Sequence, residues 1–168
     1  VTLVNASVSV APPMFVDVVN VTSAADMADV VKSKAAEQDI IIMTAAVADF
    51  CPSHPADEKI KKNDSSYESV IELERTEDIL SYLGAHKAKG QLICGFSMET
   101  QNMLENSKAK LAKKNADMIV ANNLKVAGAG FGTDTNVVTL ITADDCTELE
   151  IMDKSCVASR IMDRLLQM

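Results

Sequence analysis

The chain has 168 residues, of which 48% are hydrophobic and 24% are charged, values that are ordinary for one soluble globular domain. No stretch approaches the roughly 20 apolar residues that a membrane span requires. Its 16 basic and 24 acidic residues give a formal net charge of -8, which disfavours binding to nucleic acid or to an anionic membrane surface. We therefore expect a cytoplasmic protein without nucleic-acid or membrane partners, in which a local group of lysines meets any anionic ligand.

The cysteines give no sign of a disulfide framework or a zinc site. They stand at positions 51, 94, 146 and 156, without C-x-x-C spacing. Only His54 and His86 accompany them, so reduced thiols are expected and no metal-binding residue is predicted. Val1 opens a β-branched run without a basic leader, so no signal peptide is expected. Because the first residue is not Met, we expect a fragment of a longer protein.

The hydrophobic pattern predicts alternating strands and helices. In chain order, strands are predicted at 1–10 and 15–21, a helix at 23–38, strands at 39–45 and 69–75, a helix at 76–87, a strand at 91–96, a helix at 101–115, a strand at 117–122, a hairpin from 137–142 to 147–152, and a C-terminal helix from Asp153. Ser23 and Asp26 have the spacing of a helix N-cap and its third-position partner. The continuous apolar run at 39–45 is typical of a strand buried on both faces.

This order of elements indicates an α/β fold. Strands that alternate with helices of 10 to 15 residues imply parallel pairing with right-handed crossovers. The predicted architecture is a Rossmann-like, doubly wound, mostly parallel sheet with helices on both faces and an antiparallel hairpin at the edge. One domain is expected over 1–168. Because such sheets bind ligands beyond the carboxyl ends of their strands, the loops after Ala45, Phe96 and Asn122 are the expected site.

The loop after the 39–45 strand has an unusual composition, AAVADFCPSHPADEKIKK at 45–62. Ala45 and Ala46 are small enough for a ligand to approach the backbone, and the Asp49 carboxylate can accept hydrogen bonds. Lys59, with two further lysines at 61 and 62, could form a phosphate cradle beside exposed backbone amides. The alternative is a solvated loop whose lysines offset an acidic surface.

Two more segments carry candidate ligand contacts. Phe96, at the end of a predicted strand, could stack on a nucleobase, or it could belong to the core. Lys110 and Lys114 lie four residues apart on one face of the 101–115 helix and could grip a polyphosphate, or they could be ordinary solvated surface. The glycines of VAGAGFGTDTN at 126–136 precede a strand, which is the wrong context for a dinucleotide fingerprint, so NAD is rejected and a turn or a cover over a site is expected.

Taken together, these segments resemble the synthetase domain of bacterial phosphopantothenoylcysteine synthetase, the ligase part of a bifunctional decarboxylase and ligase. The matching segments are AAVADF at 45–50, KIKK at 59–62, GF..ET at 95–100, K..KKNAD at 110–117, IVAN at 119–122 and GF..D.N at 130–136. They occur in the family's order. Each fragment alone is weak, but the joint pattern is specific.

The resemblance implies a ligase of coenzyme A biosynthesis that joins 4'-phosphopantothenate to cysteine with CTP and Mg²⁺. In that family the substrate carboxylate attacks the α-phosphorus of CTP to give an acyl cytidylate, and the cysteine amine then displaces CMP. A free carboxylate is a poor acyl donor, so a nucleotidyl leaving group and positive charge at the reacting phosphate make chemical sense. The alternatives are a catalytically incomplete, nucleotide-binding fragment of that enzyme and an unrelated α/β interaction domain.

The resemblance also implies roles for individual residues. The implied nucleotide contacts are Met43, Thr44, Ala45, Asp49, the segment Glu77, Asp78, Ile79 and Leu80, then Phe96 at the cytosine, and Lys110 and Lys114 at the triphosphate. Ala46 would lie against the acyl cytidylate. Lys59 is the implied catalytic cation near the reacting phosphate, and Mg²⁺ would be held by phosphate oxygens rather than by protein ligands.

Some family features are absent or changed. A glycine-rich strand-turn-helix with an S-S-G segment and an asparagine normally precedes the matching region, so we expect an incomplete active site. Thr76 and Glu77 replace the usual Asn-Pro, and Asn123 stands where Asp is common. The family further implies a homodimer and, in many members, a fused N-terminal flavin-dependent decarboxylase.

Overall fold

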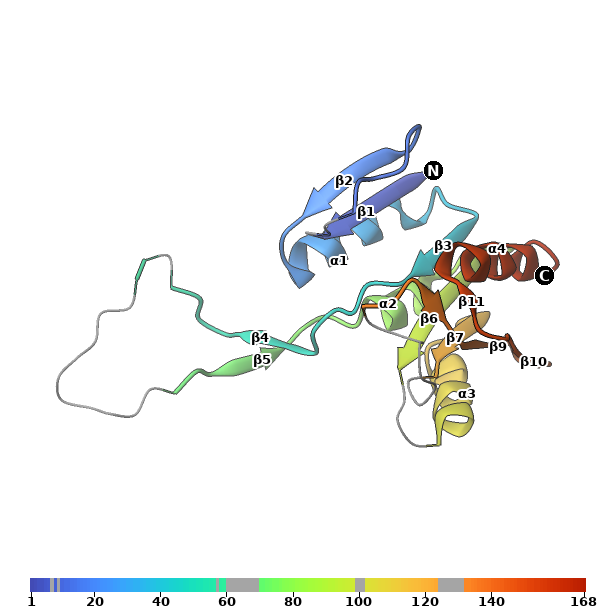
Figure 1. The fold of residues 1–168 in the computed structure, drawn as a ribbon. Helices are drawn as coiled ribbons and strands as arrows, with labels where there is room; N and C mark the ends of the chain where they lie inside the picture. The colour runs from blue at the N-terminus through green and yellow to red at the C-terminus, as the bar shows by residue number, and fades with distance from the viewer. Residues whose placement is uncertain (7, 9, 57, 60–69, 99–101, 124–131) are drawn as a thin grey trace. The chain divides into compact units, whose positions relative to one another are not determined.

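The computed structural model describes residues 1–6, 8, 10–56, 58–59, 70–98, 102–123 and 132–168 (Figure 1). The elements are β1 (Thr2–Ala6), β2 (Asp17–Val21), α1 (Ala24–Ala35), β3 (Ile40–Met43), β4 (Phe50–Pro52), β5 (Leu73–Arg75), α2 (Ile79–His86), β6 (Leu92–Met98), α3 (Met103–Lys113), β7 (Met118–Asn122), β8 (Thr135–Asn136), β9 (Val138–Ile141), β10 (Cys146–Glu148), β11 (Met152–Asp153) and α4 (Lys154–Leu165). The chain forms two compact units: unit 1 is Val1–Val31 with Ala45–Asp78, and unit 2 is Lys32–Thr44 with Ile79–Met168.

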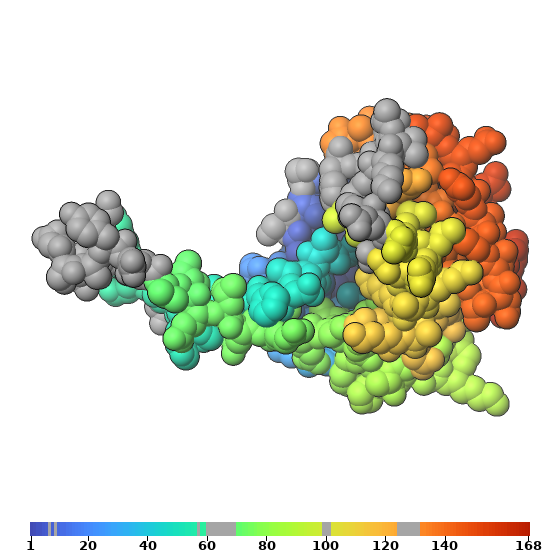
Figure 2. All heavy atoms as spheres, turned by 90° about the horizontal axis from the view of Figure 1, so that it is seen from below, coloured from blue at the N-terminus to red at the C-terminus, as the bar shows by residue number. Residues whose placement is uncertain are grey.

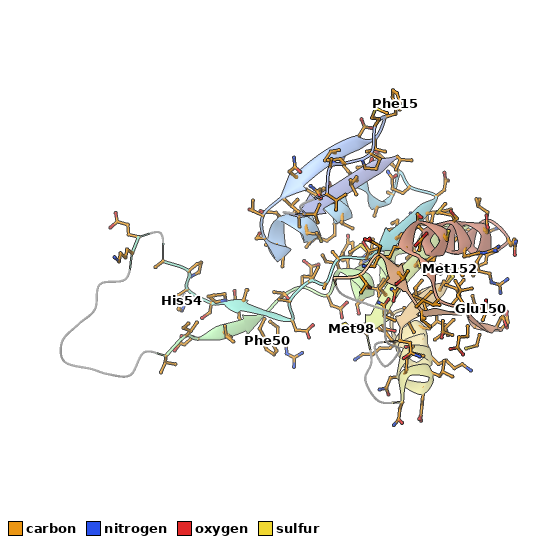
Figure 3. The ribbon with its side chains drawn as sticks, in the orientation of Figure 1. Phe15, Phe50, His54, Met98, Glu150 and Met152 are labelled. Atoms are coloured by element: carbon orange, nitrogen blue, oxygen red, sulfur yellow. The ribbon has the colours of Figure 1, made fainter. Side chains whose placement is uncertain are left out.

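Unit 1 contains a parallel pair of strands and the start of α1. β1 and β2 pair from Thr2 opposite Asp17 onward. The sequence predicted both strands, and the structure shows them as a separate two-stranded sheet. The loop between them carries Phe15, labelled in Figure 3, which has a positive φ of 65° and is 98% exposed.

The first turn of α1 is closed by the expected capping residues. Ser23 Oγ accepts the Asp26 N–H at 3.1 Å, and Asp26 Oδ2 accepts the Ser23 N–H at 2.9 Å. The Thr22 hydroxyl donates to the same carboxylate oxygen at 2.8 Å. These bonds satisfy backbone donors that the helix cannot pair internally, so the predicted N-cap is confirmed.

Unit 1 also contains a short antiparallel ribbon that the sequence analysis did not predict in full. β4 pairs with β5, with Phe50 opposite Arg75. The Arg75 guanidinium lies 5.4 Å from the centre of the Phe50 ring, which is labelled in Figure 3. β5 falls within the predicted 69–75 strand, whereas β4 lies in a segment with two prolines that has no strand periodicity of its own.

Unit 2 is built on a five-stranded sheet in the order β10-β9-β7-β6-β3. β3, β6 and β7 are parallel, and β9 and β10 add an antiparallel hairpin at one edge. This arrangement confirms the predicted mixed sheet and its edge hairpin. The short antiparallel pair of β8 with β11 was not predicted.

Helices cover both faces of this sheet. Neighbouring residues of a strand point to opposite faces, so Cys94 and Gly95 of β6 face different helices. Cys94 belongs to a core cluster that includes Val157, Ile161 and Leu165 of α4. On the other face, Gly95 lies against Leu80 of α2. The predicted placement of helices on both faces is therefore confirmed.

Charged and amide side chains form hydrogen bonds and an ion pair at the amino-terminal edge of the sheet. Asp117 Oδ2 accepts the Ile93 N–H at 2.7 Å, and its Oδ1 lies 2.9 Å from Lys87 Nζ. The buried Gln91 donates from Nε2 to the carbonyl oxygens of Ala35, the last residue of α1, at 2.7 Å, and of Gln38, at 2.6 Å. These contacts satisfy polar groups that burial would otherwise penalise.

None of the helices within the described ranges is both long and apolar enough to cross a bilayer.

Candidate functional site

The parallel strands of unit 2 end along one edge of the sheet. Met43, the last residue of β3, pairs with Gly95, and β6 continues to Met98, which pairs with Asn122 at the end of β7. Figure 3 labels Met98, which is half exposed at this edge. Because the strands run in the same direction, the loops that follow them start from a common edge. This edge is the one from which the sequence analysis expected the ligand site to be built.

Phe96 contributes both its ring and its backbone near this edge. The half-buried ring packs against the α4-side core cluster, as the core alternative expected. The carbonyl oxygen of Phe96 accepts a hydrogen bond of 2.8 Å from Lys110 Nζ. Contact between the remaining exposed part of the ring and a nucleobase stays a prediction.

The lysines of α3 and of its C-cap, Lys114, fall into two kinds. Lys108 and Lys113 are exposed, whereas Lys110 and Lys114 are half-buried. Lys114 Nζ donates to Ser81 Oγ at 2.9 Å. The interpretation as plain solvated surface therefore suits the first pair but not the second, although a bond to phosphate stays a prediction. Figure 2 shows α3, in yellow, on the face of unit 2 turned toward the viewer.

The start of α2 packs closely on the sheet. Ile79 is buried and Leu80 is half-buried. A Cβ placed on Gly95 would lie 2.7 Å from Leu80 Cδ2 and 3.1 Å from Ile119 Cδ1. The first distance is shorter than real Cβ contacts, so a larger residue at Gly95 would require the Leu80 side chain to shift.

The predicted site residues are divided between the two units. Those in unit 2 are Met43, Thr44, Ile79, Leu80, Phe96, Lys110 and Lys114. Those in unit 1 are Ala45, Ala46, Asp49, Lys59, Glu77 and Asp78, all of which are exposed. The Asp49 carbonyl accepts the Thr76 N–H at 3.0 Å, which ties the residues beside the β4–β5 ribbon together. Each assigned ligand contact remains a prediction.

Several expected features lie outside the described residues. They are Lys61, Lys62, Glu99, Thr100, Gly128 and Gly130. Gly132 is described and has φ of 72°, a left-handed conformation that agrees with the expected turn. Among the residues whose placement is described, no group of three or more His, Cys, Asp and Glu side chains is arranged to hold a metal ion.

The sequence analysis missed two polar residues that contact predicted site elements. Ser81 is one, because its bond to Lys114 joins two helices 33 residues apart. Asn136 is another: its Nδ2 donates to Asn122 Oδ1 at 2.8 Å, and its own Oδ1 accepts the Val137 N–H at 2.9 Å. Asn136 lies in the GF..D.N segment, but no local pattern identifies its partner on β7.

The fold and these residues define a mixed α/β protein of the doubly wound class, with one partly buried lysine bonded near the end of the central parallel strand β6 and a second bonded to α2. The chain belongs to the family of DNA/pantothenate metabolism flavoprotein C-terminal domains, whose model matches residues 1–168. The resemblance found in the sequence is therefore confirmed.

Known proteins match almost the whole chain. It is 45% identical over 167 residues to the Bacillus subtilis coenzyme A biosynthesis bifunctional protein CoaBC. It is 44% identical over 168 residues to a cysteine/cysteine sulfinic acid decarboxylase of an unknown prokaryotic organism. These matches cover 98% and 99% of the chain but only 40% and 46% of the relatives, so the chain spans less than half of their length.

A solved structure gives the same fold. The crystal structure of the C-terminal domain of a coenzyme A biosynthesis bifunctional protein CoaBC aligns with a TM-score of 0.79 at 40% identity. The alignment covers 99% of this chain and 74% of that one. The predicted α/β architecture is thus the architecture of this family.

Proposed function

We propose that this chain is part of a phosphopantothenate-cysteine ligase of coenzyme A biosynthesis that uses CTP. Support comes from the family match over 1–168 and from the relatives named as coenzyme A biosynthesis proteins. The decarboxylase name of the other relative belongs to a protein of which the chain spans 46%, and we assign that activity to the part outside the match. The observation that carries the proposal is the family match along the entire chain.

The proposed reaction has two steps with balanced bonds. A carboxylate oxygen of 4'-phosphopantothenate attacks the α-phosphorus of CTP, and the bond from that phosphorus to pyrophosphate breaks. The nitrogen of cysteine then attacks the acyl carbon, the carbon–oxygen bond to CMP breaks, and the amine loses a proton as the amide forms. Both steps build negative charge on phosphate oxygens, which positioned cations stabilise.

Lys110 and Lys114 suit the role of triphosphate binding. They are partly buried and one helical turn apart, and their amines reach oxygen acceptors beside β6 and on α2. An ammonium group has three N–H donors, so it can keep such an acceptor and also form a charge-assisted bond to a phosphate oxygen. Phe96, at the end of β6, would contact the cytosine.

The exposed residues of unit 1 would act on the reacting end of the nucleotide. We assign the catalytic cation to Lys59, a nucleotide contact to Asp49, and the space for the acyl cytidylate to Ala46. Met43, Thr44, Ala45 and the segment from Glu77 to Leu80 would complete the wall of the nucleotide site. Mg²⁺ would be bound by phosphate oxygens and would neutralise part of their charge.

The test is a ligase assay in a chimera of the Bacillus subtilis relative in which this chain replaces the matching region. Pyrophosphate release is measured with CTP, 4'-phosphopantothenate, cysteine and Mg²⁺. We expect turnover, and we expect Lys59→Gln to reduce it about a hundredfold or more, since a cation at the transition state is lost. The exposed Lys89 gives the matched control, Lys89→Gln, with unchanged turnover. Equal turnover in both variants would remove Lys59 from this role.

The alternative is that the chain binds nucleotide without catalysing ligation. Titration calorimetry of the 168-residue chain with CTP and with ATP, each with Mg²⁺, separates the cases. Binding of CTP by the chain, with no turnover by the folded chimera, would favour the alternative. Absence of binding to either nucleotide would count against both.

We extend the proposal to the assembly. The family resemblance favours a homodimer, and the unmatched length of the relatives agrees with a fused decarboxylase. Sedimentation analysis of the purified chain would test the dimer directly. A monomer at micromolar concentration would contradict it.

A further inference from the structure

We propose that Ser81 is a positioning residue that holds the Lys114 ammonium group ready for the triphosphate. This inference rests on the proposed function, because it assigns Lys114 to phosphate binding. Ser81 lies outside the family pattern from which the site residues were predicted. Its role follows from the packing of α2 against α3.

Lys114 is held by α2 at both ends. Its Nζ donates to Ser81 Oγ at 2.9 Å. Its carbonyl oxygen occupies the place that a Cβ on Gly84 would take, so the two backbones are in close contact. Asn115, the next residue, donates from Nδ2 to the Gly84 carbonyl at 2.7 Å. Ser81 and Gly84 lie three residues apart and therefore on one face of α2.

Contacts at both the backbone and the side-chain amine reduce the flexibility of Lys114. A lysine side chain is a flexible four-carbon stem, and ordering it on ligand binding lowers affinity. The Ser81 contact restricts the stem before the ligand arrives.

The first test measures the contact without any nucleotide. The 168-residue chain is labelled with limiting acetic anhydride, and acetylation at each lysine is followed by mass spectrometry. Ser81→Ala should speed labelling of Lys114 about two- to tenfold, the range expected for one lost hydrogen bond, and leave Lys110 unchanged. Ser81→Thr keeps the hydroxyl and should restore the slow rate. The control is Ser159→Ala, whose hydroxyl donates to the Ser155 carbonyl within α4.

The second test measures the consequence for binding. Calorimetry with Mg²⁺-CTP, pyrophosphate and CMP should show about two- to tenfold weaker binding of the first two to Ser81→Ala and unchanged binding of CMP. In a Lys114→Gln background, Ser81→Ala should have no further effect, because the group that it positions is gone. If Ser81 had only a structural role, Ser81→Ala would weaken CMP binding as well. Its effect on CTP binding would then also persist in the Lys114→Gln background.

The outcomes separate the two proposals. Unchanged labelling of Lys114, or equal loss for CMP and CTP, would overturn the role of Ser81. If the unsubstituted chain binds neither CTP nor pyrophosphate, the proposed function fails and the positioning role fails with it, whatever the labelling shows. If CTP binds equally well to Ser81→Ala and to the unsubstituted chain, only the role of Ser81 fails.

Discussion

The Lys110 ammonium nitrogen lies 2.8 Å from the carbonyl oxygen of Phe96, which ties the last turn of α3 to the carboxyl-terminal half of β6. The lysine is thereby directed toward the edge where the parallel strands end. Lys108, on the same helix, is exposed and points elsewhere. This difference makes a charge-matched comparison possible.

We expect Lys110→Gln to weaken binding of Mg²⁺-CTP about tenfold or more, since a charged hydrogen bond to phosphate contributes about 1.5–3 kcal/mol. Lys108→Gln removes the same charge from the exposed face and should change the affinity less than twofold, because salt screens exposed charges. Calorimetry at 0.15 M salt measures both variants. Similar losses in the two would mean that only the overall charge of α3 matters.

Gly84→Ala should destabilise the protein, although alanine is the better helix former by about 1 kcal/mol. The added Cβ would overlap the Lys114 carbonyl oxygen, and relieving such overpacking costs about 1–3 kcal/mol. The free energy of unfolding from urea titration measures the effect. Ala85→Gly, at the exposed neighbour on α2, measures the difference in helix propensity between alanine and glycine. It should lower the free energy of unfolding by about 1 kcal/mol. A Gly84→Ala variant as stable as the unsubstituted chain would show that α2 can move away from α3 without loss.

Cys94 should be the unreactive cysteine of unit 2. Burial, with a smaller contribution from the Asp117 carboxylate, raises the pKa of its thiol from 9.0 to about 12. Cys146 and Cys156 are exposed free thiols. With iodoacetamide at pH 8, these two should be alkylated and Cys94 should react only on unfolding. Alkylation of Cys94 at the rate of Cys146 in the folded chain would contradict this expectation.

The raised pKa of Cys94 also fixes the sign of an alkaline pH effect. Above about pH 9 the unfolded chain loses the thiol proton while the folded chain keeps it, so folding stability should fall as the pH rises from 9 toward 12. Cys94→Ala should flatten that part of the stability curve, measured by urea unfolding between pH 8 and 10. A slope identical to that of the unsubstituted chain would exclude this contribution.

Asp26 should affect stability at the acid end. Hydrogen bonds from the side chains of Thr22 and Ser23, then from their backbone N–H groups, lower the pKa of Asp26 below 3.8. A lowered folded-state pKa adds stability that is present above the unfolded value and lost as the pH falls through the folded one. Asp26→Asn should therefore destabilise the chain at pH 7 and reduce the loss of stability below pH 4. Asp163→Asn, at an exposed position on α4, makes the same change of net charge and is the control. If the Asp26→Asn variant lost stability below pH 4 as steeply as the unsubstituted chain, the expectation would be contradicted.

Local sequence patterns determined much of the fold. The Ser23 and Asp26 spacing predicted the start of α1, because a capping box needs only residues three positions apart. The apolar run at 39–45 predicted the strand β3, but its expected burial on both faces was wrong, because β3 is half-buried at one edge of the five-stranded sheet. The spacing of Lys110 and Lys114 placed them on one helical face. The alternation of these elements sufficed to predict a parallel sheet covered by helices.

The tertiary structure decided which of these elements pair and pack against one another. The pairing of β4 with β5, the bond from Lys114 to Ser81 and the contact of Gly84 with the Lys114 backbone all join residues far apart in the sequence, 33 positions in the case of Lys114 and Ser81. No periodicity marks such pairs, because each depends on how two whole elements pack rather than on the chemistry of neighbours. The residue types of the candidate site could thus be predicted from the chain alone, whereas the acceptors that orient Lys110 and Lys114 are set by the packing of α2 and α3 against β6.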